Sequence, residues 1–145
     1  GRALFPLVTA AALAAGACFA PAALHNRFYR VFPPELVDAL EQADPQRLYT
    51  SFNAGGMAIQ AGFRSFVDSR AQLFTPEMLV DAQILAGTRR QSATWSIDQV
   101  LTRWQFDAVL LAKYDAELTA SYFAGRDDWR MVYDGAWYTL FVPQT

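Results

Sequence analysis

Five residues in the first half of the chain have the types and spacing to bind a phosphate or a sugar. They are Asn53, the paired Gly55 and Gly56, and, beyond a short helical segment, Asp68 and Arg70. Backbone N–H groups at a helix start attract anions, and an arginine can bind phosphate oxygens through two parallel hydrogen bonds. These five residues are therefore the candidate ligand-binding site.

The elements that must position these residues form a predicted βαβ unit. Residues 48–52 favour a strand, the paired glycines a tight turn, residues 57–63 a short helix, and residues 65–70 a second strand. The polar residues then fall where the strands end. Open α/β sheets bind their ligands at the carboxyl ends of their strands, so the site is expected at that edge.

A structural interpretation of the same residues is also open, and it is the one we favour. On a strand, Asp68 and Arg70 share a face, so they can form an ion pair with each other. The glycines can serve the turn alone, because a dinucleotide-binding fingerprint needs three spaced glycines and this turn has two adjacent ones.

The composition excludes several kinds of site. The chain has 145 residues with one Cys and one His, which excludes an intrachain disulfide framework and a Cys/His zinc site. Its 12 Lys and Arg against 14 Asp and Glu give a formal charge of −2, without the basic stripe of a nucleic-acid-binding protein. We therefore expect no nucleic-acid partner, no metal and no cofactor, and we assign no catalytic residue.

The N-terminal segment is apolar. Residues 3–20 carry no charge and are just long enough to span a bilayer, which predicts a transmembrane helix over residues 1–24, the last of several. A secretory signal and a buried soluble helix are the alternatives. Residues 25–34 are predicted to be an interfacial linker, because aromatic and basic side chains suit a membrane surface; these are Arg27, Phe28, Tyr29 and Arg30.

Residues 35–145 are predicted to form one α/β domain. Helix starts are marked by Pro33-Pro34, by Thr75 before Pro76, and by the capping-box pattern that begins at Ser96. The apolar residues 106–112 predict a central parallel strand, and Asp134-Gly135 predicts a hairpin. The expected fold is a three-layer, mainly parallel sheet with strand order 2-1-3 and a C-terminal hairpin, preceded by one apolar helix.

With these motifs in place, the chain resembles the C-terminal extracytoplasmic domain of bacterial multi-pass membrane glycosyltransferase-like proteins that use polyprenyl-phosphate sugars. The resemblance covers most of residues 26–143. It depends on the turn at 53–56, the segment 66–70, the helix–strand pair at 95–111 and the strand at 129–133. One departure lies between that helix and strand, where Gln105 replaces the usual glycine.

The resemblance implies a membrane enzyme whose catalytic carboxylates lie in loops between earlier membrane helices, outside this chain. It implies the lipid bilayer and a polyprenyl-phosphate sugar as partners, and a domain on the extracytoplasmic side of the cell membrane. Three functions remain open. They are an accessory domain of a membrane glycosyltransferase, a stand-alone anchored or exported ligand-binding module, and a small soluble enzyme that uses Asp68.

Overall fold

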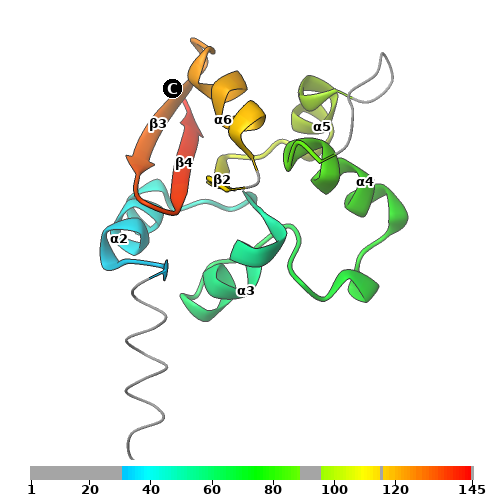
Figure 1. The fold of residues 1–145 in the computed structure, drawn as a ribbon, viewed down its shortest axis with the longest axis horizontal. Coiled ribbons are helices and arrows are strands. Elements are labelled where there is room, and N and C mark those ends of the chain that lie inside the picture. The colour runs from blue at the N-terminus through cyan, green and yellow to red at the C-terminus, as the bar shows by residue number, and fades with distance from the viewer. Residues whose placement is uncertain (1–30, 89–95, 115, 145) are drawn as a thin grey trace, which may run out of the picture. The chain divides into compact units, whose positions relative to one another are not determined.

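The computed structural model describes residues 31–88, 96–114 and 116–144 (Figure 1). The chain divides between Pro34 and Glu35 into two units. The predicted transmembrane helix and nearly all of the predicted linker lie outside the described residues. Within the three described ranges, no helix is long and apolar enough to cross a membrane.

Helices and strands alternate along most of the chain. In order they are α2 (Pro34–Ala43), β1 (Leu48–Thr50), α3 (Phe52–Gln60), the 3₁₀ helix η1 (Ala71–Leu73), α4 (Pro76–Leu85), α5 (Ile97–Trp104), β2 (Ala108–Ala112), α6 (Glu117–Ala124), β3 (Trp129–Asp134) and β4 (Tyr138–Pro143).

The four strands form one sheet in the order β1-β2-β4-β3. β1 and β2 run parallel, whereas β2 pairs with β4 and β4 pairs with β3 in antiparallel register. The prediction of a mainly parallel sheet is therefore wrong, because the sheet is mixed. The α/β class is confirmed, and so is the hairpin, which places β3 at one edge of the sheet.

Residues 65–70 do not form the predicted second strand. A single parallel bridge, between Ser65 and Leu48, places this segment beside β1. The carboxylate of Asp68 accepts a hydrogen bond from the N–H of Arg70, which bends the chain, and the Ser65 hydroxyl bonds to the carbonyl two residues on. Local side-chain bonds thus compete with a strand ladder for the backbone. In the predicted order 2-1-3, strands 1 and 3 are present as the parallel pair β1 and β2. The predicted strand 2 is present only as the single bridge between Ser65 and Leu48.

The main apolar core lies between one face of the sheet and helices α4, α5 and α6. Its buried members from the strands are Tyr49, Val109, Leu111, Trp129 and Phe141. All five residues of β2 are buried, although only alternate ones belong to this core. Because successive strand residues point to opposite faces, the second face of the sheet is covered as well. Figure 1 shows α2 and α3 on that side.

Two of the predicted helix starts are confirmed at the level of single hydrogen bonds. The Thr75 hydroxyl accepts from the N–H of Met78, with Pro76 in the first turn of α4. At the start of α5, Ser96 and Gln99 form a complete capping box, in which each side chain accepts from the other residue's N–H. Such caps satisfy N–H groups that have no partner inside the helix.

The chain passes from α5 to β2 through Gln105, which has a φ of 50°. This left-handed conformation favours glycine, the residue that the family resemblance leads one to expect here. The glutamine makes a contact that glycine could not make, because its Oε1 accepts a hydrogen bond from Nη1 of Arg47 at 2.6 Å. That bond ties the end of α5 to the residues before β1.

Candidate functional site

The five predicted site residues do not form one cluster. Asn53 and Gly56 are exposed on α3, whereas Gly55 and Asp68 are buried and lie against each other. Arg70 is paired with Asp68. The structure therefore brings Gly55, Asp68 and Arg70 together and leaves Asn53 and Gly56 on the helix surface. A ligand-binding role for the five residues stays a prediction.

The start of α3 has no side-chain cap. Ser51 stands at the N-cap position, but its Oγ accepts a hydrogen bond from the N–H of Ala112 at 2.9 Å. The hydroxyl thus joins the end of β1 to the end of β2 instead of satisfying the helix. An anion beside Asn53 could complete this helix start, and that also stays a prediction.

Gly55 is the point where α3 meets the segment that carries Asp68. A Cβ atom added to Gly55 would lie 2.2 Å from the carbonyl oxygen of Val67 and 2.8 Å from Cα of Asp68. Both are backbone atoms, so neither can rotate away. A Cβ added to Gly56 would meet no atom within 4 Å. The two glycines therefore differ in role. Gly55 permits a close approach of two backbones, whereas no atom approaches Gly56 closely enough to require a glycine there.

The Asp68–Arg70 pair has bidentate geometry. Nη2 and Nε of Arg70 donate to Oδ2 of Asp68 at 2.5 and 3.0 Å, and Nε also lies 3.1 Å from Oδ1. The backbone N–H of Arg70 donates to Oδ1 at 2.7 Å. The Asp68 side chain is 4% exposed, whereas that of Arg70 is 58% exposed. The Asp68 carboxylate is thus buried beneath the guanidinium group of Arg70, two positions further along the chain.

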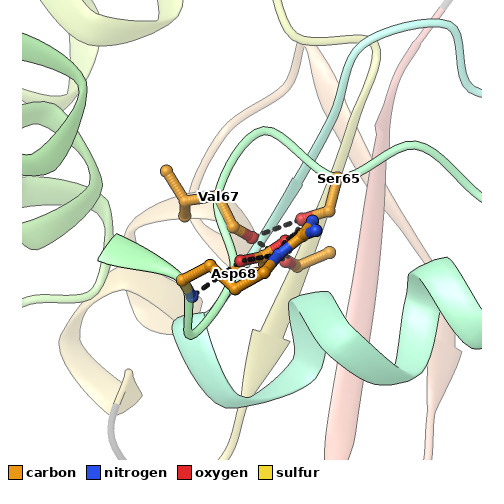
Figure 2. A network of polar contacts seen from close by, with 5 residues as sticks. Ser65, Val67 and Asp68 are labelled. Atoms are coloured by element: carbon orange, nitrogen blue, oxygen red, sulfur yellow. Dashed lines mark hydrogen bonds and ion pairs between the residues drawn. The ribbon is translucent and has the colours of Figure 1, made fainter. Parts of the chain in front are cut away.

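Hydrogen bonds of two hydroxyl groups join the segment 65–70 to β1, beside the ion pair (Figure 2). The Oγ atoms of Thr50 and Ser65 lie 2.6 Å apart, and both contact the carbonyl oxygen of Val67, at 3.3 and 2.5 Å. Thr50 is fully buried. Buried hydroxyls need such partners, since an unsatisfied one would cost about 1–3 kcal/mol. This network holds Val67 against β1.

The arginine favours the ionised form of Asp68. The hydrogen bonds from the Arg70 side chain hold the pKa of Asp68 below its usual value of 3.8, although burial acts in the opposite direction. Asp68 is therefore ionised at neutral pH and its oxygens are already engaged. A general acid needs a pKa near the working pH, so this environment is unsuited to acid catalysis by Asp68.

We expect Arg70→Ala to lower stability at neutral pH, because it leaves a buried carboxylate without its partner. The folded-state pKa of Asp68 is lowered, so its contribution is fully present above the unfolded value near 3.8 and is lost as the pH falls through the lower folded value. The difference between wild type and variant should therefore vanish in acid. Urea unfolding followed by circular dichroism across this pH range measures it.

Arg64→Ala is the matched control, since no hydrogen bond or ion pair joins its side chain to any described residue, and its removal should change stability little at any pH. The double variant Asp68→Ala/Arg70→Ala should recover part of the loss, because no lone charge remains. An equal loss at every pH, or no loss at neutral pH, would rule out the structural pair.

A second polar network joins the start of α5 to the end of α6. Oδ1 of Asp98 accepts from the Tyr122 hydroxyl at 2.5 Å and from Arg126 at 2.6 Å, and Arg126 also binds Asp128. Burial and the bond to Asp98 raise the pKa of Tyr122 to about 12, so the phenol stays protonated. Each group here is engaged with another, which is typical of a surface ion-pair network that stabilises helix packing.

Sequence reasoning missed a cavity of about 450 Å³ at the amino end of β1. None of the five predicted site residues lines it. Its lining comes from three separate stretches of the chain: Gln46, Arg47 and Leu48; Arg64, Ser65 and Phe66; and Met78, Arg103, Trp104 and Phe106. Three of these residues are arginines, but they are too far apart in the sequence to form a recognisable motif.

Comparisons with family models, with curated proteins and with solved structures find no match to this chain. In the described part of the chain, no group of three or more Asp, Glu, His or Cys residues could hold a metal ion.

Proposed function

We propose that this chain is the C-terminal accessory domain of an integral membrane glycosyltransferase-like protein, and that it carries none of the catalytic carboxylates. One observation carries the proposal. The two motifs on which the family resemblance most depends, residues 53–56 and 66–70, pack against each other through Gly55. The residues that make these motifs distinctive thus join α3 to the neighbouring segment, as expected of a domain whose signature is structural.

The state of Asp68 supports a non-catalytic domain over a small soluble enzyme. An enzyme that used Asp68 would need a carboxyl group able to exchange a proton and reach a substrate. This carboxylate is 4% exposed and bound by Arg70. The domain therefore contributes structure or substrate contact, and the chemistry belongs to other parts of the protein.

The apolar sequence at the N-terminus supports attachment to a membrane. Residues 3–20 carry no charge, and the segment 25–34 has the aromatic and basic residues of a membrane interface. In the proposal, residues 1–24 span the lipid bilayer and residues 35–145 lie on the extracytoplasmic side. There the domain would be close to a polyprenyl-phosphate sugar held at the membrane surface.

Cysteine labelling in intact cells tests this arrangement. In cells that express the full-length gene product, Asn26→Cys is introduced after the native Cys18 has been replaced by alanine. A membrane-impermeant maleimide should label Cys at position 26 in intact cells, and the protein should stay with the membrane fraction after carbonate extraction. Cys18→Ala alone, which lacks any thiol in this chain, is the control for background labelling.

Labelling only after lysis would place the domain in the cytoplasm and contradict the proposed orientation. Recovery of the protein in the soluble extracytoplasmic fraction would instead favour the exported ligand-binding module. Either outcome would overturn the accessory-domain proposal.

A further inference from the structure

Three arginines line the cavity at the amino end of β1. They are Arg47, Arg64 and Arg103, and no Asp or Glu is among the described lining residues of the cavity. The chain as a whole has a formal charge of −2, so three arginines around one cavity are a local departure from its composition. A cavity walled by guanidinium groups raises the local concentration of anions.

The three arginines are held to different degrees. Nη1 of Arg103 donates to the buried Asp81 at 2.6 Å and lies 3.3 Å from Glu77. Arg47 gives one Nη1 bond to Gln105. Arg64 is exposed, and no hydrogen bond or ion pair joins its side chain to any other residue in the described ranges. Arg64 therefore has its whole donor fork available to a ligand, and Arg47 retains part of its own.

Two carboxylates next to the cavity are bound to residues other than Arg64. Oδ2 of Asp81 accepts from Arg103 and from the indole N–H of Trp104, at 2.6 and 2.7 Å. The carboxylate of Asp107 accepts the backbone N–H groups of Gln46 and Arg47, both at 2.9 Å. Asp81 offsets the charge of Arg103, and Asp107 is hydrogen-bonded to the backbone, but neither pairs with Arg64.

Part of the cavity lining is aromatic, and its rings pack against one another. The ring centroid of Phe66 lies 4.7 Å from that of Trp104 and 4.9 Å from that of Phe106, at interplanar angles of 58° and 79°. The bond from the indole N–H to Asp81 fixes the orientation of Trp104. Such a lining offers flat apolar surface at little cost in side-chain entropy, because the rings are held before any ligand arrives.

We propose that this cavity binds a phosphate ester with a planar or apolar part. The phosphate contacts Arg64 and Arg47, and the apolar part lies against Phe66 and Trp104. Arginine forks match phosphate oxygens, and a doubly charged phosphate monoester suits several guanidinium groups better than a singly charged carboxylate does. The volume of about 450 Å³ lies in the range of small-molecule sites. The inference stands whether or not the chain belongs to a glycosyltransferase.

Titration of the full chain with phenyl phosphate, followed by ¹H–¹⁵N spectra, tests the proposal. The indole N–H of Trp104 should shift on binding, whereas that of Trp137, which does not line the cavity, should not. Inorganic phosphate, which lacks the apolar part, and benzoate, which lacks the second charge, should each bind about tenfold more weakly. Vesicles with and without phosphatidic acid form a second arm, which distinguishes a lipid headgroup from a soluble ester.

Matched arginine variants locate the binding. Arg64→Gln should weaken phenyl phosphate binding about tenfold, as expected for the loss of a charge-assisted contact, and Arg47→Gln/Arg64→Gln should abolish it. Arg130→Gln is the control, because Arg130 is exposed on β3, outside the cavity, and its loss removes the same charge. Thermal unfolding of each variant checks that the fold is kept.

Three outcomes would overturn the proposal. They are no shift of the Trp104 indole with either phenyl phosphate or phosphatidic acid vesicles, equal weakening by Arg64→Gln and Arg130→Gln, and binding of inorganic phosphate as tight as that of phenyl phosphate. The first would show that the cavity takes no phosphate ester. The second would show that binding depends on the net charge of the protein and not on Arg64. The third would show that the aromatic residues do not contribute to ligand recognition.

Discussion

Gly55→Ala is expected to destabilise the domain by about 3 kcal/mol or more, because its methyl group would overlap backbone atoms that cannot move aside. The added Cβ would lie 2.2 Å from the carbonyl oxygen of Val67 and 2.8 Å from Cα of Asp68. Relief would require α3 to separate from that segment. The separation would disturb the buried contacts of Asp68 and Thr50.

Gly56→Ala is the matched control for this prediction. Gly56 is the next residue along the same helix, it is exposed, and there is open space where a Cβ would be added. Alanine is the better helix former, so this variant should be more stable than wild type by up to about 1 kcal/mol. Both substitutions gain the same helix propensity, so the difference between them isolates the steric overlap.

Urea denaturation of the two glycine variants measures the effect. Similar midpoints for Gly55→Ala and Gly56→Ala would show that the contact between α3 and the segment 65–70 is loose. A loss for Gly55→Ala that is not accompanied by a weaker Asp68–Arg70 pair would also contradict the packing argument. The pair can be followed by the pH dependence of stability described above.

Arg103→Met is expected to destabilise the domain by about 2–4 kcal/mol. Asp81 lies within α4 with a side chain that is 0% exposed, and Arg103 and Trp104 donate to its Oδ2. Its Oδ1 has no hydrogen-bond partner in the described structure. Without Arg103, the buried carboxylate of Asp81 would keep one uncharged hydrogen-bond donor, the indole N–H of Trp104. The Arg103 side chain is 36% exposed, so the expected loss is set below that of a fully buried pair.

Glu77→Gln separates this buried pair from the exposed one. Glu77 also lies near Arg103, at 3.3 Å, but its side chain is 57% exposed, so its loss should cost less than about 0.5 kcal/mol. Asp81→Asn/Arg103→Met should be more stable than Arg103→Met alone, since it removes the buried charge. A double variant that is no more stable than the single one would mean that lost packing of the arginine stem, and not the uncompensated carboxylate, accounts for the effect.

Several elements were predictable because their signals are local. The caps at Thr75 and Ser96 and the hairpin at Asp134-Gly135 depend on side chains and turns within a few residues of one another. The burial of β2 followed from its continuous apolar sequence. The Asp68–Arg70 contact was also predictable, since its partners are only two positions apart in the sequence, although the pair forms in a turn and not on the predicted strand.

The sequence by itself therefore determined the starts of α4 and α5, the hairpin and the buried central strand, because the interacting groups are close along the chain. It placed the helix after the paired glycines at residues 57–63, whereas α3 spans Phe52–Gln60 and contains both glycines. The tertiary structure decided the mixed order of the sheet, the need for glycine at position 55, the burial of Asp81 in α4, and the cavity. Each of these depends on contacts between distant segments: Asp81 is held by an arginine 22 residues away, and Arg47 by a glutamine 58 residues away. The alternating or helical spacing of apolar residues indicates which face of a strand or helix is buried. It carries no information on which distant segments pack together.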